Sequence, residues 1–280
     1  MIINVFLTVN KLYFRATMMN LDLQGKTAVV CGSTQGIGRS VAIQLAELGA
    51  KIVLVARSEE KLKEVEKELS SHSGAEHEYI AADFSNPQQL KQLITEYVEK
   101  GGNCHILVNN TGGPKGGPVI DAEIEEFYSA FTQHLVCNHI LVQALVPLMK
   151  QNEYGRIINI ISTSVKQPLP NLGVSNTIRG AVANWSKTLA GELGQFNITV
   201  NNVLPGATNT VRLQSIAESK SEKTKASVDN IFKEMADESP MKRIAEPEET
   251  ANAVAFLASP AASYINGINV PVDGGRTKSL

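Results

Sequence analysis

Short runs of apolar residues alternate with longer segments along most of the chain. The short runs are rich in aliphatic and β-branched residues and predict strands at 27–32, 52–57, 77–84, 105–110, 155–162, 198–206 and 268–272. The longer segments predict helices at 36–49, 58–71, 87–100, 121–150, 172–195 and 247–258. Several strands are apolar at consecutive positions, which is typical of strands buried on both faces. The alternation predicts a single-domain α/β fold of the Rossmann type, with a doubly wound parallel sheet.

Two segments depart from this alternation. Residues 1–20 begin with an apolar run that is too short to span a bilayer and lacks the features of a signal peptide. We interpret them as a poorly ordered N-terminal extension of a domain at 21–280, with a transit peptide as the alternative. Residues 211–240 are polar, rich in Lys, Glu and Ser, and only weakly helical in period. We interpret this segment as an inserted lid.

Composition excludes several classes of protein. The 280 residues are 43% hydrophobic and 19% charged, which excludes a disordered or collagen-like chain. The chain has 26 Lys and Arg residues and 28 Asp and Glu residues, so its net charge gives no basic field to attract nucleic acid or a membrane surface. Cys31, Cys104 and Cys137 are widely spaced and form no zinc motif, so neither disulfides nor a metal site are expected. A reducing, cytoplasmic setting is the default expectation.

A glycine-rich turn joins the first strand to the first helix. Gly32, Gly36 and Gly38 have the spacing G-x3-G-x-G. Such glycines permit a tight turn and close backbone approach, and the N–H groups of the helix N-terminus suit a pyrophosphate. In this strand–turn–helix context the loop predicts dinucleotide binding rather than a plain packing turn.

This loop resembles the glycine motif of the short-chain dehydrogenase/reductase family, and later segments extend the likeness. Asn109-Asn110-Thr111-Gly112 resembles the family's NNAG motif, and Pro205-Gly206 with Thr210 resembles its PG-x3-T segment. Residues 264–267 and 272–275 resemble its C-terminal strand region. The likeness covers roughly residues 24–280, and the β-ketoacyl-carrier-protein reductase-like members are the most similar. It implies a cofactor site formed by Gly32, Ser33, Thr34, Gln35, Gly36, Ile37, Gly38, Arg57, Asp83, Phe84, Asn110, Thr111, Gly112, Arg179, Pro205, Gly206, Thr208 and Thr210.

The end of the second strand favours NADP over NAD as the cofactor. An NAD enzyme places a carboxylate there for the ribose 2′-OH, whereas this chain has Ala56 followed by Arg57. A guanidinium binds a 2′-phosphate through charge-assisted hydrogen bonds. Gln35 weakens the argument, because many NADP-dependent relatives have a basic residue at its position. A solvated arginine at a helix start is the alternative for Arg57.

The family's catalytic pattern is largely replaced. Ser162 matches the family's serine. The family has a Tyr thirteen residues after this serine and a Lys four residues after the Tyr, where this chain has Ser175 and Arg179. The family also has an Asn about 28 residues before the serine, where this chain has His134. No tyrosine in the chain has a lysine four residues later. The segment resembles an atypical subgroup in which an SNxxR-type segment replaces YxxxK.

The proton donor is therefore open. A serine hydroxyl is a far weaker acid than tyrosine, and loss of a general acid costs about 10²–10⁴ in rate. His134 has a pKa suited to acid–base work, with a hydrogen-bonded, partly buried histidine as the alternative. Lys166, four residues after Ser162, and a bridging water are further candidates. A serine hydrolase is disfavoured because the chain lacks a G-x-S-x-G elbow.

Two functions fit these observations. We expect an NADP(H)-dependent oxidoreductase acting on a small carbonyl or hydroxyl substrate, or on an activated C=C bond, with Ser162, Ser175, Arg179 and His134 as a non-standard catalytic set. The alternative is a dinucleotide-binding protein with little turnover, acting as a sensor or an oligomer partner. The resemblance also implies a homodimer or homotetramer paired through the helices at 121–150 and 172–195.

Overall fold

The computed structural model describes residues 19–73 and 75–279, so nearly all of the expected N-terminal extension lies outside the described residues. Within them the chain forms a seven-stranded parallel sheet in the order β3-β2-β1-β4-β5-β6-β7. The predicted α/β fold with a doubly wound parallel sheet is confirmed. The strands are β1 (Thr27–Cys31), β2 (Lys51–Ala56), β3 (Glu78–Ala81), β4 (Ile106–Asn109), β5 (Gly155–Ile160), β6 (Ile198–Pro205) and β7 (Asn269–Val272).

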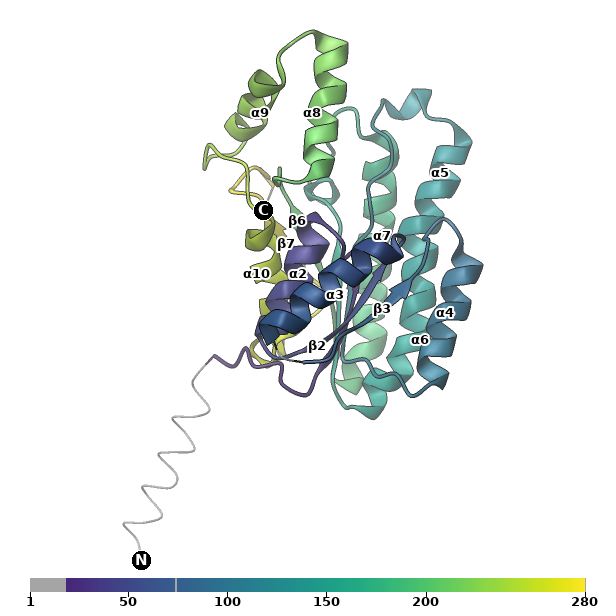
Figure 1. The fold of residues 1–280 in the computed structure, drawn as a ribbon. Helices are drawn as coiled ribbons and strands as arrows, with labels where there is room; N and C mark the ends of the chain where they lie inside the picture. The colour runs from purple at the N-terminus through teal and green to yellow at the C-terminus, as the bar shows by residue number, and fades with distance from the viewer. Residues whose placement is uncertain (1–18, 74, 280) are drawn as a thin grey trace, which may run out of the picture.

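Helices cover both faces of the sheet (Figure 1). One face is covered by α2 (Gly36–Glu47), α3 (Glu59–Ser73) and α10 (Pro247–Ala258), and the other by α4 (Pro87–Glu99), α6 (Cys137–Gln151) and α7 (Gly173–Leu193). Alternate residues of β1 enter the two cores: Ala28 and Val30 pack on one side, Val29 and Cys31 on the other. Because both faces of the strand are buried, its sequence is continuously apolar.

The helices differ in how they begin. Asn86 caps α4 by accepting a hydrogen bond from the Gln89 N–H at 3.1 Å, and Glu246 and Glu249 form a capping box on α10. In contrast, α2 begins after Gln35 with no side-chain cap and no acidic residue in its first turn. Helix geometry leaves its first N–H groups without a partner inside the helix, so they remain able to bind an external acceptor.

The predicted helix at 121–150 is interrupted. It consists of a 3₁₀ turn, η1 (Val119–Asp121), then α5 (Ile124–Phe131), a π-turn, η2 (Thr132–Val136), and α6. Single π-turns inside helices are frequent at functional sites. His134 lies in this turn and is hydrogen-bonded to Thr111 in the loop after β4.

Residues 211–240 form a helical hairpin, which is more regular than their pattern predicted. α8 (Val211–Thr224) begins at the cap Thr210 and α9 (Val228–Asp237) at the cap Ser227, and the two helices pack on each other. Figure 1 shows the hairpin projecting beyond the end of β6. Each helix buries one residue, Ala217 or Ile231. The helical period is weak in the sequence because so little of either helix is buried.

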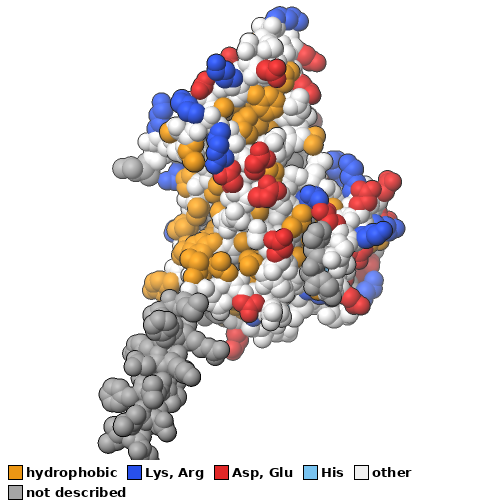
Figure 2. All heavy atoms as spheres, turned by 60° about the vertical axis from the view of Figure 1, so that its left-hand side comes forward, with side chains coloured by type: hydrophobic (Ala, Val, Ile, Leu, Met, Phe, Trp, Pro, Cys, Tyr) orange, Lys and Arg blue, Asp and Glu red, His pale blue; other side chains and the backbone are white. Residues whose placement is uncertain are grey.

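The face that carries the hairpin is mixed in charge. Figure 2 shows Lys and Arg side chains interspersed with Asp and Glu, with hydrophobic patches between them. This agrees with the formal net charge of -2 and leaves no extended basic field on that face. Among the described residues, no helix has the length and apolar character needed to cross a membrane, and no group of His, Cys, Asp and Glu is placed to hold a metal ion.

Candidate active site

The glycine loop lies where the strand order of the sheet reverses. β1 pairs with β2 on one side and with β4 on the other, and in doubly wound sheets this switch point is where ligands bind. The Asn110 amide, just after β4, donates hydrogen bonds to the carbonyls of Cys31 and Gly32, both at 3.3 Å. The NNTG segment therefore holds the glycine loop in place.

The backbone requires each glycine of this loop. Gly32 and Gly36 have φ angles of +60° and +52°, in the left-handed region. A Cβ on Gly38 would lie 2.1 Å from the Gly32 carbonyl oxygen, and a Cβ on Gly36 would lie 3.1 Å from the Thr210 methyl group. Together with the uncapped N-terminus of α2, the loop forms a cradle of bare backbone. Such a cradle fits a dinucleotide pyrophosphate.

Arg57 and Asp83 lie at the ends of the next two strands. Arg57 is exposed and makes no hydrogen bond or ion pair with another described residue. The Asp83 carboxylate accepts a hydrogen bond from the Ser85 N–H at 2.9 Å. That hydrogen bond, assisted by the charge of Arg57, lowers the pKa of Asp83. The guanidinium is thus available to a bound phosphate.

The remaining predicted cofactor residues fall into a buried group and a group that is at least partly exposed to solvent. Ser33, Phe84 and Thr208 are buried and support the backbone of the crevice. Gly206 packs so closely on the C-terminal strand region that a Cβ would lie 2.8 Å from the Asp273 Cα. The partly or fully exposed residues are Thr34, Gln35, Ile37, Thr111, Gly112, Pro205 and Thr210.

The four predicted catalytic residues come from elements that pack on one another. Ser162 follows β5 and accepts a hydrogen bond from the Ser164 N–H at 3.1 Å, which caps the 3₁₀ turn η3 (Thr163–Val165). Ser175 and Arg179 lie one turn apart on α7, which packs against both η3 and the π-turn of His134. Lys166 ends η3, and its ammonium makes no hydrogen bond or ion pair with another described residue.

His134 is buried and uncharged. Its Nδ1 shares a hydrogen bond with the Thr111 hydroxyl. Burial, followed by the positive charge of Arg179, lowers the pKa of His134 to about 2. The expectation that its pKa suits acid–base work near neutral pH was wrong, because the site holds the ring too far from water and too near a cation.

Arg179 is a buried cation without an acidic partner among the described residues. Its side chain is directed at the end of β5, where Nη1 donates to the Ile160 carbonyl at 3.0 Å. The residue is 7% exposed, and its Nε has no hydrogen-bond partner. Burial, followed by the charge of Arg212, lowers the pKa of Arg179 to about 10, so it stays charged at neutral pH.

The sequence analysis assigned no role to two side chains near this site. Arg212, in the first turn of α8, donates from Nη2 to the Pro114 carbonyl at 2.6 Å and so connects the α8–α9 hairpin to the loop after β4. The Asn176 amide bonds to both the carbonyl and the N–H of Leu169, at 2.8 and 3.4 Å, and closes the loop before α7. The signal for Arg212 was its place at the start of the lid, directly after the PG-x3-T segment.

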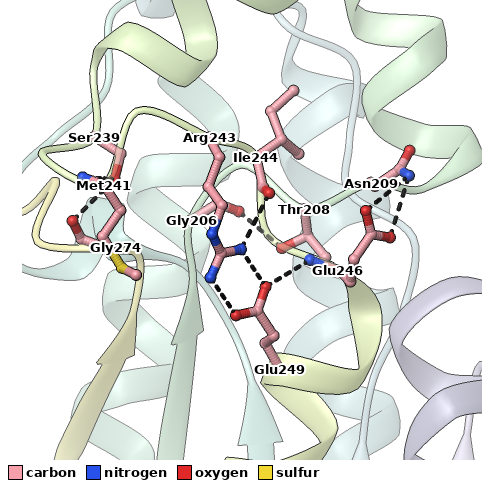
Figure 3. Close-up of polar contacts among 10 residues, drawn as sticks. All are labelled: Gly206, Thr208, Asn209, Ser239, Met241, Arg243, Ile244, Glu246, Glu249 and Gly274. Atoms are coloured by element: carbon pink, nitrogen blue, oxygen red, sulfur yellow. Dashed lines mark hydrogen bonds and ion pairs between the residues drawn. The ribbon is translucent and has the colours of Figure 1, made fainter.

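Hydrogen bonds and an ion pair connect the residues that flank the α8–α9 hairpin (Figure 3). Arg243 forms a bidentate ion pair with Glu249, with both hydrogen bonds at 2.6 Å. The Asn209 amide, just before α8, donates to the Glu246 carboxylate at 3.2 Å. A cavity of about 260 Å³ beside this network lies outside the candidate site, since no predicted catalytic residue lines it.

The chain is similar in sequence to known proteins along nearly its whole length. The family model described as enoyl-(acyl carrier protein) reductase matches residues 32–277. The NADPH-dependent reductase BacG of Bacillus subtilis is 34% identical over 256 residues, covering 91% of this chain and 99% of that protein. The 3-oxoacyl-[acyl-carrier-protein] reductase FabG of Staphylococcus epidermidis is 34% identical over 253 residues, covering 89% of this chain and 98% of that protein.

Solved structures agree with these matches. The crystal structure of L-sorbose reductase from Gluconobacter frateurii, complexed with NADPH and L-sorbose, superposes with a TM-score of 0.88 at 33% identity. The superposition covers 94% of this chain and 100% of that one. The fold, the cradle at the switch point and the matches along nearly the whole length lead to one conclusion: the chain belongs to the short-chain dehydrogenase/reductase family.

Proposed function

We propose that this protein is an NADPH-dependent reductase of a small carbonyl compound or an activated C=C bond, with Ser162, Ser175, Arg179 and His134 in the place of the family's usual catalytic set. The observation that carries the proposal is the bare-backbone cradle in front of the uncapped α2. BacG and L-sorbose reductase, which the chain resembles, are both named with NADPH.

The cofactor's parts have separate partners in this proposal. The glycine loop and the N-terminus of α2 hold the pyrophosphate, and Arg57 holds the 2′-phosphate that distinguishes NADPH from NADH. Asp83 contacts the adenine, and Thr210, beside Gly36, contacts the carboxamide. Bound NADPH supplies a hydride to the substrate.

The chemistry assigned to the chain's own residues is mainly electrostatic. The hydroxyls of Ser162 and Ser175 orient the substrate oxygen, and Arg179 stabilises the negative charge that develops on it. Arg179 does not release its proton at neutral pH, because its pKa of about 10 lies well above that range. Neutral His134 positions Thr111 through their hydrogen bond, and water supplies the proton. A conjugated C=C bond suits this site, because its reduction passes through a stabilised enolate.

The low pKa of His134 also favours the second candidate, a dinucleotide-binding protein with little turnover. With His134 neutral and Ser175 a weak acid, no predicted catalytic side chain of the site titrates near pH 7. NADPH consumption across a panel of ketones and enones separates the candidates. Binding of NADPH without turnover on any member of the panel would favour the sensor or oligomer-partner function.

Glycine substitutions test the proposal directly. Gly36→Ala introduces a side chain at φ +52° and 3.1 Å from the Thr210 methyl group, so we expect at least a tenfold loss of NADPH affinity in a fluorescence titration. Gly180→Ala is the matched control. Gly180 lies on α7, the helix that carries Arg179, and a Cβ there would meet nothing within 4 Å. Unchanged NADPH binding by Gly36→Ala would contradict the proposal.

We also propose that the chain forms a homodimer or homotetramer. Ile124, Tyr128 and Phe131 lie on one face of α5 and are 58%, 69% and 43% exposed, an apolar stripe that a second copy can cover. Light scattering should show more than one chain in the particle and dissociation in Tyr128→Lys. Tyr264→Lys is the control, because Tyr264 is fully exposed and follows α10 in the chain instead of lying on α5. A monomeric wild-type protein would contradict the proposal.

The cysteines support a cytoplasmic location within this proposal. Cys31, Cys104 and Cys137 are all buried and unpaired by disulfides. Burial raises the pKa of the Cys137 thiol to about 11, which keeps it protonated and unreactive. Thiols in this state suit a reducing compartment.

A further inference from the structure

Arg179 places a positive charge in the interior of the candidate active site, and no described residue supplies a negative charge to balance it. It is more than nine-tenths buried, and its Nε has no hydrogen-bond partner. Its one hydrogen bond goes to the Ile160 carbonyl, an uncharged acceptor. A buried charge is costly unless it is paired. The guanidinium is therefore poised to bind an acceptor group of a molecule that enters the site.

Arg212 adds a second positive charge to the same end of the site. Its Nη2 donates to the Pro114 carbonyl, and a Cβ on Gly113 would lie 3.6 Å from that nitrogen. Thr111, in the same loop, bonds to His134 beside Arg179. Arg212 also has no carboxylate within ion-pair distance among the described residues. Arg212 is exposed and lies close enough to Arg179 for its charge to lower the pKa of Arg179. Neither guanidinium has an acidic partner among the described residues, so an anion that reached both would offset their mutual repulsion.

The phosphates of the cofactor do not account for this pair. The pyrophosphate cradle follows β1, and Arg57 follows β2 on the far side of the switch point. Arg179 lies instead beside β5, and Arg212 follows β6 in the lid. The ribose hydroxyls can engage Arg179 but carry no charge, and Arg212 comes from a different element. The excess positive charge thus lies at the substrate end.

Resting on the proposed reductase function, we propose that the substrate carries a carboxylate next to its reducible bond and that Arg179 and Arg212 bind this carboxylate. A planar guanidinium matches a carboxylate with two parallel hydrogen bonds. The substrate class is a 2-oxo acid or an α,β-unsaturated oxo acid. For a 2-oxo acid, hydride from NADPH adds to the carbonyl carbon, the C=O π bond breaks, and the oxygen takes a proton from water. The products are a 2-hydroxy acid, NADP⁺ and hydroxide.

Calorimetric titration of the full chain saturated with NADPH tests the assignment. The probe is oxamate, whose carboxylate adjoins a planar amide carbonyl, and the matched neutral probe is its methyl ester. We expect oxamate to bind at least tenfold more tightly than the ester. Arg212→Gln should weaken oxamate about 10–100-fold, as expected for loss of a charge-assisted hydrogen-bonded pair, while NADPH affinity stays unchanged.

Lys220→Gln is the matched control for charge. It removes one positive charge from the same helix, two turns further along, where Lys220 pairs with Glu234 at 2.7 Å on the surface. If the contact is direct, this variant keeps the wild-type affinity for oxamate. An equal loss in Lys220→Gln and Arg212→Gln would show a diffuse field instead of a binding site and would overturn the proposal.

Failure of this inference can be told apart from failure of the proposed function. If NADPH binds and ketones are reduced, but oxamate binds no better than its ester, the proposed reductase function is retained and the proposed carboxylate site is rejected. Displacement of NADPH by oxamate would place the anion in the cofactor site and also overturn the inference. If NADPH does not bind, the proposed function is rejected. The arginine pair is then tested alone, by comparing the affinity of the cofactor-free chain for oxamate with that of cofactor-free Arg212→Gln.

Discussion

Replacing Arg179 by methionine should make the protein more stable and less active. The guanidinium has no acidic partner among the described residues, and burial is the main cause that lowers its pKa from 12.5 to about 10. That fall corresponds to roughly 3 kcal/mol of unfavourable free energy for holding the charge in the folded protein. The single hydrogen bond to Ile160 returns roughly 1–2 kcal/mol. Methionine occupies a similar space without a charge, so the net gain is about 1–2 kcal/mol.

The assay is thermal unfolding of the cofactor-free protein, alongside steady-state turnover. A gain of about 1 kcal/mol raises Tm by roughly 2–4 °C in chains of around this size. In the Arg179→Met variant, kcat/KM should fall about 10²–10³-fold relative to the wild-type protein, the usual loss when a group that stabilises developing negative charge is removed. Opposite changes in stability and activity are the signature of a strained functional residue.

Arg156 provides the matched comparison. It is 1% exposed, but Nη1 donates to the carbonyls of Gly155 and Asn197 at 2.8 and 3.3 Å, and the guanidinium lies 4.1 Å above the Tyr154 ring. Arg156→Met should therefore lose about 1–3 kcal/mol of stability. If Arg179→Met is destabilised to a similar extent, Arg179 is a structural residue and the reasoning is refuted.

Three further outcomes are expected. Arg57→Ala should weaken NADPH binding about 10–100-fold and leave NADH binding unchanged; equal affinity of the wild-type protein for both cofactors in a fluorescence titration would contradict this. His134 is neutral when folded but titrates near pH 6.5 when unfolded, so its contribution to stability is complete above that pH and is lost toward acid by about 1.4 kcal/mol per pH unit. Denaturant unfolding at several pH values should show a shallower acid loss in His134→Asn, and an identical slope would show that the ring is not held neutral. Reduction of a β-ketoacyl thioester should be about 10²–10⁴-fold slower than in a relative with Tyr and Lys, and Ser175→Tyr combined with Arg179→Lys should raise it; an ordinary wild-type rate, measured by NADPH consumption, would show that the tyrosine matters less than argued.

Local sequence carries the fold and the cofactor cradle of this protein. In strands such as β1 and β2 the apolar residues are consecutive because both faces of the strand are buried, and this pattern can be recognised without knowing what packs against the strand. Gly32, Gly36 and Gly38 lie within seven residues, so the backbone geometry that demands them is set inside one turn. The absence of any tyrosine with a lysine four residues later is likewise visible in the linear chain.

Tertiary structure decided the charge states of the residues around His134 and Arg179. His134 looks titratable in sequence, and only burial beside Arg179, 45 positions away, makes it neutral. Arg212 reaches Pro114 across 98 positions, which no pattern of spacing predicts. Such a pKa and such a long-range hydrogen bond depend on solvent exclusion and on groups brought together by the packing of β5, α7 and the α8–α9 hairpin. The sequence by itself therefore determined where a dinucleotide can lie, and the packed structure decided that His134 is neutral and that Arg179 is a buried cation.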